Sequence, residues 1–187
     1  VVDPDFSATK SANPENKEAF EKLEDLGQQE GLDLLIATDP DADRIGLSVW
    51  HEGAYHILNG NQTGVLMLDY LMRMHEKNGT MPEKPVVFST IVSTDMAEKM
   101  VKRNRMSYVK TLTGFKYIGE QMELLKETDF NFLFGFEESY GYIVKDITRD
   151  KDALQATLVA SLMAEEAKRQ GKTLIDQLDQ LYETYGV

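Results

Sequence analysis

Three aspartates at alternate positions are the residues best suited to carry chemistry. The stretch LLIATDPDADRIGLSVW covers residues 34–50 and places Asp39, Asp41 and Asp43 between two apolar runs. Arg44 follows the last aspartate directly. Like charges about 4 Å apart repel by roughly 4 kcal/mol per pair at an effective dielectric near 20. Three carboxylates in one turn are therefore unfavourable without a cation, and the sequence predicts a metal site.

Two familiar aspartate motifs do not fit this stretch. An EF-hand loop that starts at Asp39 needs Gly at its sixth position and Glu at its twelfth, where this chain has Arg44 and Trp50. The strand-end Asp-x-Asp of a haloacid dehalogenase-type phosphatase normally continues into Gly-Thr, whereas Asp43 is followed by Arg44 and Ile45. Carboxylate ligands that leave coordination positions open favour Mg²⁺ holding a phosphate over a fully caged Ca²⁺.

The elements that must position this turn are two strands and a preceding helix. The apolar runs LDLLIA and IGLSVW are typical of strands, so the turn is expected to join neighbouring strands at one end of a sheet. Upstream, residues 12–31 predict a helix with Asn13 as its cap and Pro14 at its first position. Gly27 or Gly31 is expected to end that helix, and YHILNG to carry the chain out of this unit.

From about residue 60 the pattern alternates between helices and short buried strands. Helices are expected in GVLMLDYLMRMHEKNG, TDMAEKMVKRN and FKYIGEQMELLK, and at about residues 152–170 and 174–185. Strands are expected in VVFST, MSYVKT, NFLFGF and YIVK. This alternation predicts an α/β fold of three-layer α/β/α units with a mixed, largely parallel sheet. Functional loops are expected at the carboxyl ends of its strands.

Composition narrows the class of protein and its partners. The 187 residues are 42% apolar, and no apolar run reaches the roughly 18 residues of a membrane span, which predicts a soluble chain. The absence of cysteine excludes disulfides and thiol chemistry and leaves the cytoplasm as the default location. A formal net charge of −12 disfavours nucleic acid and anionic membranes as partners. A small phosphorylated ligand can bind only where a metal or clustered cations reverse that potential.

Four motifs in order resemble the α-D-phosphohexomutase superfamily, the phosphoglucomutases and phosphomannomutases. DPDADR resembles the metal loop of the family, and ANPEN is similar to its Pro-Asn-Pro-Glu stretch, with Ala12 in place of the first proline. TLTGFKYIG resembles its Thr-Gly-Phe-Lys segment. FGFEESYGY is similar to the sugar-recognition loop Glu-Glu-Ser-x-Gly of the third domain, with Phe136 where several relatives have glycine. The resemblance implies that residues 1–58 are the C-terminal part of metal-binding domain 2 and residues 59–187 are sugar-binding domain 3.

The resemblance also implies a role for each matching residue. Asp39, Asp41 and Asp43 would bind Mg²⁺, whose remaining ligands include a phosphoserine oxygen. Arg44 would face the same phosphoryl group, and Lys116 would lie near the transferring phosphate, where it stabilises charge or moves a proton. The residues implied in substrate binding are Thr113, Gly114, Glu137, Ser139, Arg149 and Lys151.

The reaction so implied transfers a phosphoryl group from an enzyme serine to a sugar monophosphate and, after the bisphosphate reorients, returns the other phosphate to the serine. No Ser-His-Asn-Pro loop occurs in this sequence, so domains 1 and 4 are expected elsewhere in a longer parent chain, and this chain alone is expected to be inactive. EESYG favours glucose 1-phosphate and glucose 6-phosphate as substrates. Phosphomannomutase and phosphopentomutase remain alternatives, as do a phosphatase and a non-catalytic or regulatory metal-binding α/β module.

Overall fold

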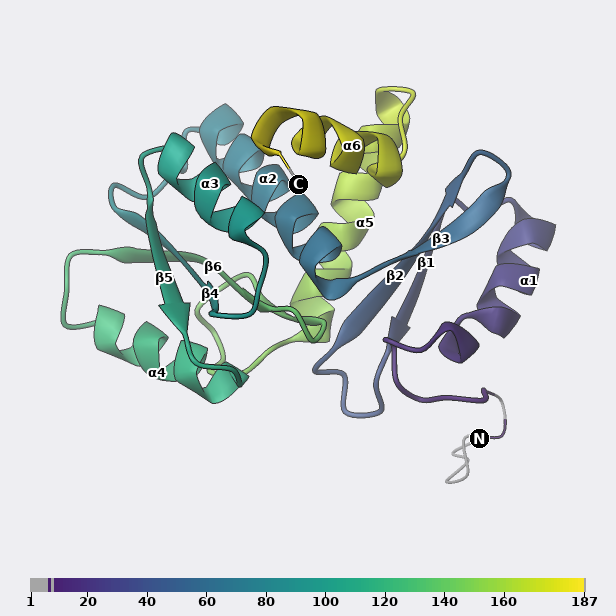
Figure 1. Ribbon diagram of the computed structural model, residues 1–187, viewed down its shortest axis with the longest axis horizontal. Helices are drawn as coiled ribbons and strands as arrows, with labels where there is room; N and C mark the ends of the chain where they lie inside the picture. Colours follow the sequence, from purple (N-terminus) through teal and green to yellow (C-terminus); the bar gives the residue numbers. More distant parts are fainter. Residues whose placement is uncertain (1–6, 8, 187) are drawn as a thin grey trace.

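Two sheets stand side by side in the computed structural model, which describes residue 7 and residues 9–186 (Figure 1). The smaller sheet contains β1 (Leu34–Thr38), β2 (Ile45–His51) and β3 (Ala54–Leu58) in that order, and both of its pairings are antiparallel. The acidic turn, residues 39–44, joins β1 to β2. The expected position of this turn at one end of a sheet is therefore confirmed.

The larger sheet has the strand order β5-β4-β6-β7. Its strands are β4 (Pro85–Thr90), β5 (Ser107–Thr111), β6 (Asn131–Glu137) and β7 (Gly141–Ile143). The first three are mutually parallel, and β7 is antiparallel to β6. The connecting and closing helices are α2 (Gly60–Asn78), α3 (Asp95–Arg103), α4 (Phe115–Leu125), α5 (Ala153–Arg169) and α6 (Leu174–Tyr185). The carboxyl ends of β4, β5 and β6 therefore lie at the same end of the sheet, where loops of an α/β sheet commonly bind ligands.

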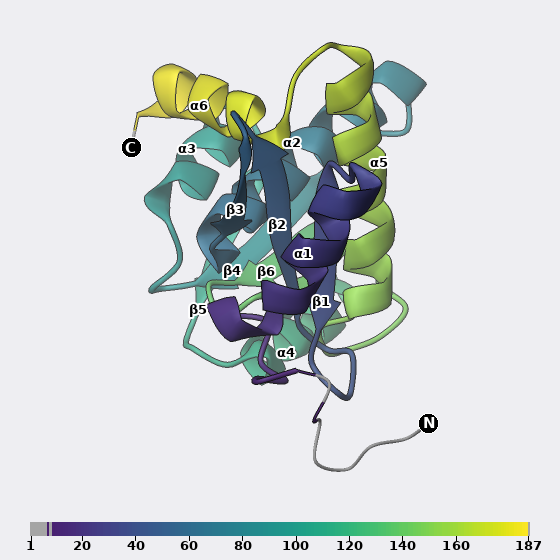
Figure 2. The same cartoon turned by 90° about the vertical axis from the view of Figure 1, so that its right-hand side faces the viewer.

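Helices cover both faces of each sheet. In the larger sheet, Val86 and Phe88 pack against Ile118 of α4, whereas Val87 between them joins the core on the opposite face, which α2 and α3 cover. In the smaller sheet, α1 (Glu21–Glu30) lies across the outer face (Figure 2). The inner face packs against α5 and α6, and one core that also includes α2 runs between the two sheets. The expected α/β/α layering is confirmed. None of the helices that the described residues form is long and apolar enough to cross a bilayer.

The helix predicted for residues 12–31 is shorter than expected. A 3₁₀ turn, η1 (Lys17–Ala19), precedes α1, and Gly31 ends α1 in the left-handed conformation. Asn13 does not cap the helix, because α1 begins only at Glu21 with Phe20 as its N-cap. The Oδ1 of Asn13 instead accepts hydrogen bonds from the Glu15 amide at 3.1 Å and from Arg44 at 3.4 Å. Pro14 is not at the first helical position either. The ANPEN motif thus forms a turn that reaches the acidic turn.

The segment YHILNG was expected only to leave the first unit, but its first residues form strand β3. Glu52 and Gly53 have φ angles of +48° and +88°, as in the two-residue turns that join antiparallel strands. The chain then enters α2 through a capping box between Asn59 and Gln62, one turn earlier than expected. The predicted domain boundary between residues 58 and 59 falls at this junction. Residues 1–6, 8 and 187 of the two predicted domains lie outside the described part of the chain.

Helix α2 approaches β6 closely because two of its residues are glycine. A Cβ on Gly60 would lie 1.9 Å from the Glu138 carbonyl oxygen, and one on Gly64 would lie 2.5 Å from the Phe136 ring. Phe136 is fully buried and stacks on Phe134, with 5.6 Å between the ring centres. The side chain of Phe136 therefore fills the space over Gly64 in the core and does not line a ligand site.

Replacing Gly64 by alanine is expected to destabilise the fold, although alanine is the better helix former. Overlap of the new methyl group with Phe136 should outweigh the helix propensity and lower the free energy of unfolding by about 1–2 kcal/mol. Urea denaturation followed by Trp50 fluorescence measures the loss. Adding Phe136→Leu to Gly64→Ala should recover part of it. A Gly64→Ala chain as stable as the original would contradict the close contact.

Candidate functional site

The acidic turn is built around the side chain of Asp39. Its Oδ1 accepts hydrogen bonds from the backbone amides of Asp43 and Arg44, each at 3.0 Å. Ala42 has a φ of +57°, and its carbonyl accepts a hydrogen bond from the Ala153 amide at the start of α5 at 3.0 Å. The turn is thus held by its first aspartate from within and by α5 from outside.

The three aspartates converge on one point. One carboxylate oxygen from each of Asp39, Asp41 and Asp43 lies within 4.8 Å of the others. Asp39 is buried, Asp41 is exposed, and Asp43 is half-buried, with an Oδ1 that has no hydrogen-bond partner among the described residues. Arg44 Nε lies 3.7 Å from this oxygen, which is too far for a hydrogen bond. A buried acceptor without a hydrogen-bond donor is uncommon. A small oxygen-seeking cation fits this donor set, because it would satisfy that oxygen and offset the mutual repulsion.

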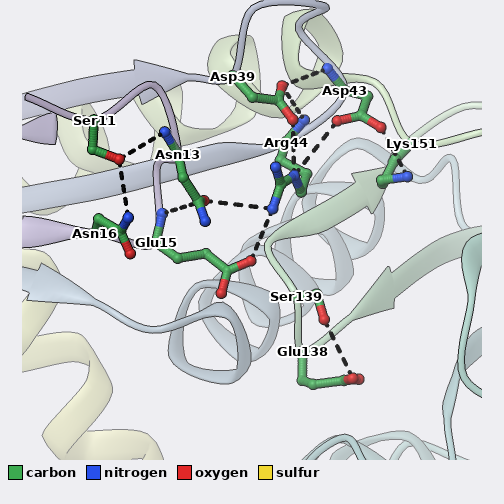
Figure 3. Close-up of polar contacts among 10 residues, drawn as sticks. All are labelled: Ser11, Asn13, Glu15, Asn16, Asp39, Asp43, Arg44, Glu138, Ser139 and Lys151. Carbon is green, nitrogen blue, oxygen red and sulfur yellow. Dashed lines mark hydrogen bonds and ion pairs between the residues drawn. The ribbon is translucent and has the colours of Figure 1, made fainter. Parts of the chain in front are cut away.

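Two basic side chains already balance part of the charge. The Nε of Arg44 donates to Asp39 Oδ2 at 2.8 Å, and its Nη1 donates to Glu15 at 3.0 Å (Figure 3). Lys151 Nζ lies 2.8 Å from Asp43 Oδ2. Burial opposes the charged form of Asp39, but hydrogen bonding with Asp43 and from Arg44 outweighs it and lowers the pKa of Asp39 to about 2. Burial and the nearby Asp39 carboxylate raise the pKa of Asp43.

The turn between β6 and β7, residues 138–140, meets the acidic turn directly. The Ile45 amide donates a hydrogen bond to the Tyr140 carbonyl at 3.2 Å, and Arg44 and Gly141 form an antiparallel bridge. Tyr140 has a φ of +65°, a left-handed conformation that is uncommon outside glycine and asparagine. These contacts join the two sheets at the site and place the acidic turn beside Glu137 and its neighbours.

Lys151 lies between the two turns. A Cβ on Gly141 would lie 2.5 Å from Lys151 Cδ and 3.0 Å from Glu137 Oε1, so only glycine leaves room for both side chains. The ammonium also lies 5.8 Å from the centre of the Phe115 ring at the start of α4. Burial opposes its charge, but the hydrogen bond to Asp43 and the surrounding carboxylates outweigh it and raise the pKa of Lys151.

The other predicted site residues lie at or near the carboxyl ends of the strands of the larger sheet. Thr113 is exposed and Gly114 has a φ of +110°, and both follow β5 and precede α4. Lys116 is exposed, and its ammonium lies 4.9 Å from the centre of the Tyr117 ring. Arg149 differs from the rest, because its guanidinium pairs with Glu123 and Asp146 and with none of the three aspartates. The structure therefore brings Lys151, but not the Arg149 side chain, to the acidic turn.

Three residues at the site were not predicted in these positions. Glu15 binds Arg44, and Thr90 and Ser93 bind the carboxylate of Glu138. The ANPEN motif contained a signal for Glu15. Thr90 and Ser93 follow a buried strand in an otherwise ordinary polar loop, so nothing in their spacing pointed to Glu138.

A cavity of about 490 Å³ elsewhere in the fold is not suited to the same chemistry. It lies between β5 and α4 and is lined mainly by apolar side chains, including Val86, Phe88, Val109, Leu124 and Phe130. None of the three aspartates lines it. Because such a surface offers few partners for a charged or hydroxyl-rich ligand, the acidic turn remains the candidate site.

Comparisons with known proteins agree with this architecture. Residues 59–185 match the model of phosphoglucomutase/phosphomannomutase alpha/beta/alpha domain III, and residues 1–52 match that of domain II. A phosphoglucomutase of Staphylococcus aureus, strain USA300, is 39% identical over 186 residues. That alignment covers 98% of this chain and 33% of the relative, so the chain spans about a third of the relative's length.

Solved structures show the same fold at lower identity. A protein of Thermus thermophilus, described provisionally as a phosphomannomutase, has a TM-score of 0.68 at 23% identity, over 90% of this chain and 35% of its own. A phosphoglucomutase/phosphomannomutase family protein of Burkholderia thailandensis has a TM-score of 0.63 at 19% identity, over 91% of this chain and 33% of its own. The chain belongs to the phosphoglucomutase/phosphomannomutase family, and the predicted family is thereby confirmed.

The buried carboxyl of Glu137 makes the stability of the fold depend on pH. Burial, opposed in part by Lys151, raises its pKa from 4.5 to about 6. Because the folded-state pKa exceeds the unfolded one, the free energy of unfolding falls as pH rises through this interval and stays lower above it. We expect Glu137→Gln to add about 2 kcal/mol at about pH 7.5, and the gain to shrink towards zero below pH 4.5.

Urea unfolding at a series of pH values measures this difference. Glu183→Gln, at an exposed position on α6, is the matched control and should show little change at any pH. A stability difference for Glu137→Gln that does not vary with pH would show that the carboxyl keeps its ordinary pKa.

Proposed function

We propose that this chain supplies the Mg²⁺-binding turn and the sugar-recognition turn of a phosphoglucomutase, which interconverts glucose 1-phosphate and glucose 6-phosphate. The observation that carries the proposal is the direct link between the two turns, through the Ile45 amide and the Tyr140 carbonyl. It brings a convergent carboxylate cluster next to Glu137 and Ser139. The 39% identity to a phosphoglucomutase supports glucose phosphates over other sugar phosphates.

In this proposal Asp39, Asp41 and Asp43 hold Mg²⁺, which fits their convergent oxygens and an Asp43 Oδ1 that accepts no hydrogen bond from the described residues. The bound ion would supply positive charge where the oxygens of a transferring phosphoryl group carry negative charge. The Nε and Nη1 of Arg44 are held by Asp39 and Glu15, which fixes the plane of the guanidinium. Its remaining nitrogen is left to bind a phosphoryl oxygen.

The other site residues would bind the sugar and its phosphates. Glu137 and Ser139 would hydrogen-bond adjacent sugar hydroxyls, and Lys151 would keep the Glu137 carboxylate oriented. Lys116, with Thr113 and Gly114 before it, would meet the transferring phosphate at the start of α4. Arg149 could contact a phosphate only by giving up its ion pairs with Glu123 and Asp146.

The complete reaction would need parts of a longer parent chain. This chain covers 33% of the S. aureus relative, which is consistent with further domains beyond the two represented here. In the proposal, residues 1–58 belong to domain 2, residues 59–187 form domain 3, domain 1 carries the phosphoserine, and domain 4 grips the non-reacting phosphate. The parent would act in the cytoplasm on sugar monophosphates and a bisphosphate. Phosphomannomutase or phosphopentomutase activity is the alternative within the same family.

The three aspartates are expected to bind divalent metal weakly in this chain, because a phosphoserine ligand is absent from it. Mn²⁺ titration followed by water-proton relaxation, with Mg²⁺ as competitor, measures the affinity. Asp41→Asn, which removes one exposed carboxylate, should weaken binding by about tenfold or more, since each charged ligand contributes on the order of 1.5–3 kcal/mol.

Asp179→Asn on α6 is the matched control, because it removes an exposed carboxylate far along the chain from the turn. It should leave the affinity unchanged. Micromolar or tighter Ca²⁺ binding with no competition from Mg²⁺ would contradict the assignment.

The parent enzyme is expected to convert glucose 1-phosphate to glucose 6-phosphate in the presence of Mg²⁺, whereas residues 1–187 alone should show only background activity.

Ser139→Ala in the parent should lower kcat/KM by about ten- to hundredfold, because the loss of a hydrogen bond to a bound hydroxyl costs on the order of 1–3 kcal/mol. A coupled dehydrogenase assay gives both results. Turnover by residues 1–187 that Asp41→Asn abolishes would refute the need for further domains.

A further inference from the structure

The carboxylate of Glu138 is held by two hydroxyl groups from another part of the chain. Thr90 Oγ1 donates to Glu138 Oε2 at 2.7 Å, and Ser93 Oγ donates to the same oxygen at 3.2 Å. The two hydroxyl oxygens lie 2.8 Å apart. Thr90 is fully buried at the carboxyl end of β4, and Ser93 is 6% exposed in the loop that follows. The hydroxyl clamp, Thr90 with Ser93, therefore reaches the turn that follows β6.

We propose that Thr90 and Ser93 are positioning residues: they clamp the Glu138 carboxylate and thereby fix the turn that presents Glu137 and Ser139 to the sugar. The sugar part of this inference rests on the proposed function, whereas the clamp itself does not. Glu138 is an anchor in this arrangement and does not bind the substrate.

The distribution of contacts on Glu138 supports an anchoring role. Its Oε2 accepts from both hydroxyls of the clamp, and its Oε1 lies 3.4 Å from Ser139 Oγ (Figure 3). Its carbonyl oxygen packs against Gly60, where a Cβ would lie only 1.9 Å away. Side chain and main chain of this one residue are thus both confined by neighbouring elements. The positions of its neighbours, Glu137 and Ser139, are therefore restricted as well.

The clamp also ties the turn to the helices behind it. Thr94, next to Ser93, caps α3 through its side chain, and its amide donates to Asn61 Oδ1 in the first turn of α2 at 3.0 Å. The amino ends of α2 and α3 are therefore linked to the clamp. Removing a hydroxyl would leave a partly buried carboxylate short of a donor, and the turn would have to shift to find water.

Hydrogen exchange in the full-length parent tests the clamp without any substrate. We expect the double variant Thr90→Val with Ser93→Ala to raise the exchange rates of the amides of residues 138–141 by about tenfold or more, with no change in α5. Thr111→Val is the matched control, because Thr111 is the register partner of Thr90 on β5 and its hydroxyl donates only to backbone carbonyls. It should leave exchange in the turn unchanged.

Kinetics then test whether the clamp serves sugar binding. We expect the double variant and Glu138→Gln each to lower kcat/KM for glucose 1-phosphate by about tenfold or more, mainly by raising KM. When all three substitutions are combined, the loss in kcat/KM should be smaller than the product of the two separate losses. Thr90→Ser, which keeps the hydroxyl, should stay within about threefold of the original. If the double variant does not fold, Ser93→Ala alone should show the same changes at smaller size.

The outcomes separate the clamp from the proposed function. Unchanged exchange in residues 138–141, or effects on kcat/KM that multiply, would overturn the clamp. A parent with no mutase activity but with faster exchange in the double variant would refute the proposed function and leave the clamp supported.

Discussion

The relative position of the two turns at the site depends on a direct backbone contact between the two sheets. The Ile45 amide reaches the Tyr140 carbonyl at 3.2 Å, and beside it Arg44 bridges to Gly141. One turn belongs to a small antiparallel sheet and the other to a larger, mainly parallel one, so no shared strand ladder sets their relative position. A backbone hydrogen bond has a narrow range of length and direction and therefore fixes it. The left-handed Tyr140 and the absence of a side chain at Gly141 are what make that contact geometrically accessible.

Several acidic side chains lie close together at the contact between the two turns, and each is stabilised in a different way. Asp39 is ionised against Arg44 and two backbone amides. Glu138 receives two neutral hydroxyl donors, and Glu137 is buried so deeply that its proton is held more tightly than usual. Asp41 is exposed. The structure therefore gives hydrogen-bond donors or a buried, more tightly held proton to the carboxylates that hold the framework. Asp43 Oδ1, which accepts no hydrogen bond from the described residues, lies where the three aspartates converge.

Residue types and periodicity could predict most of this architecture. Apolar runs and helical spacing were enough to predict the long helices and the parallel strands, because each of those elements buries apolar residues at regular spacing. The predicted start of α1 was wrong because Asn13, a good cap by type, lies in a turn where its side-chain oxygen also binds Arg44, and α1 begins only at Glu21. Strand β3 was missed because it is short and half exposed. The aspartates could be found from spacing, but the hydroxyl clamp could not, because Thr90 and Ser93 meet Glu138 only through the parallel pairing of β4 and β6. The roles assigned to the site residues remain predictions.

Phe136 lies within the motif FGFEESYGY, but its side chain is buried against Gly64 of α2. The aromatic ring occupies the volume that a side chain on α2 would otherwise fill. The two positions therefore share one space within the core, and enlargement of either requires reduction of the other. Across relatives, the two positions should covary, so that a small residue at the position of Phe136 accompanies a larger one at the position of Gly64. This covariation should not depend on which sugar each relative accepts.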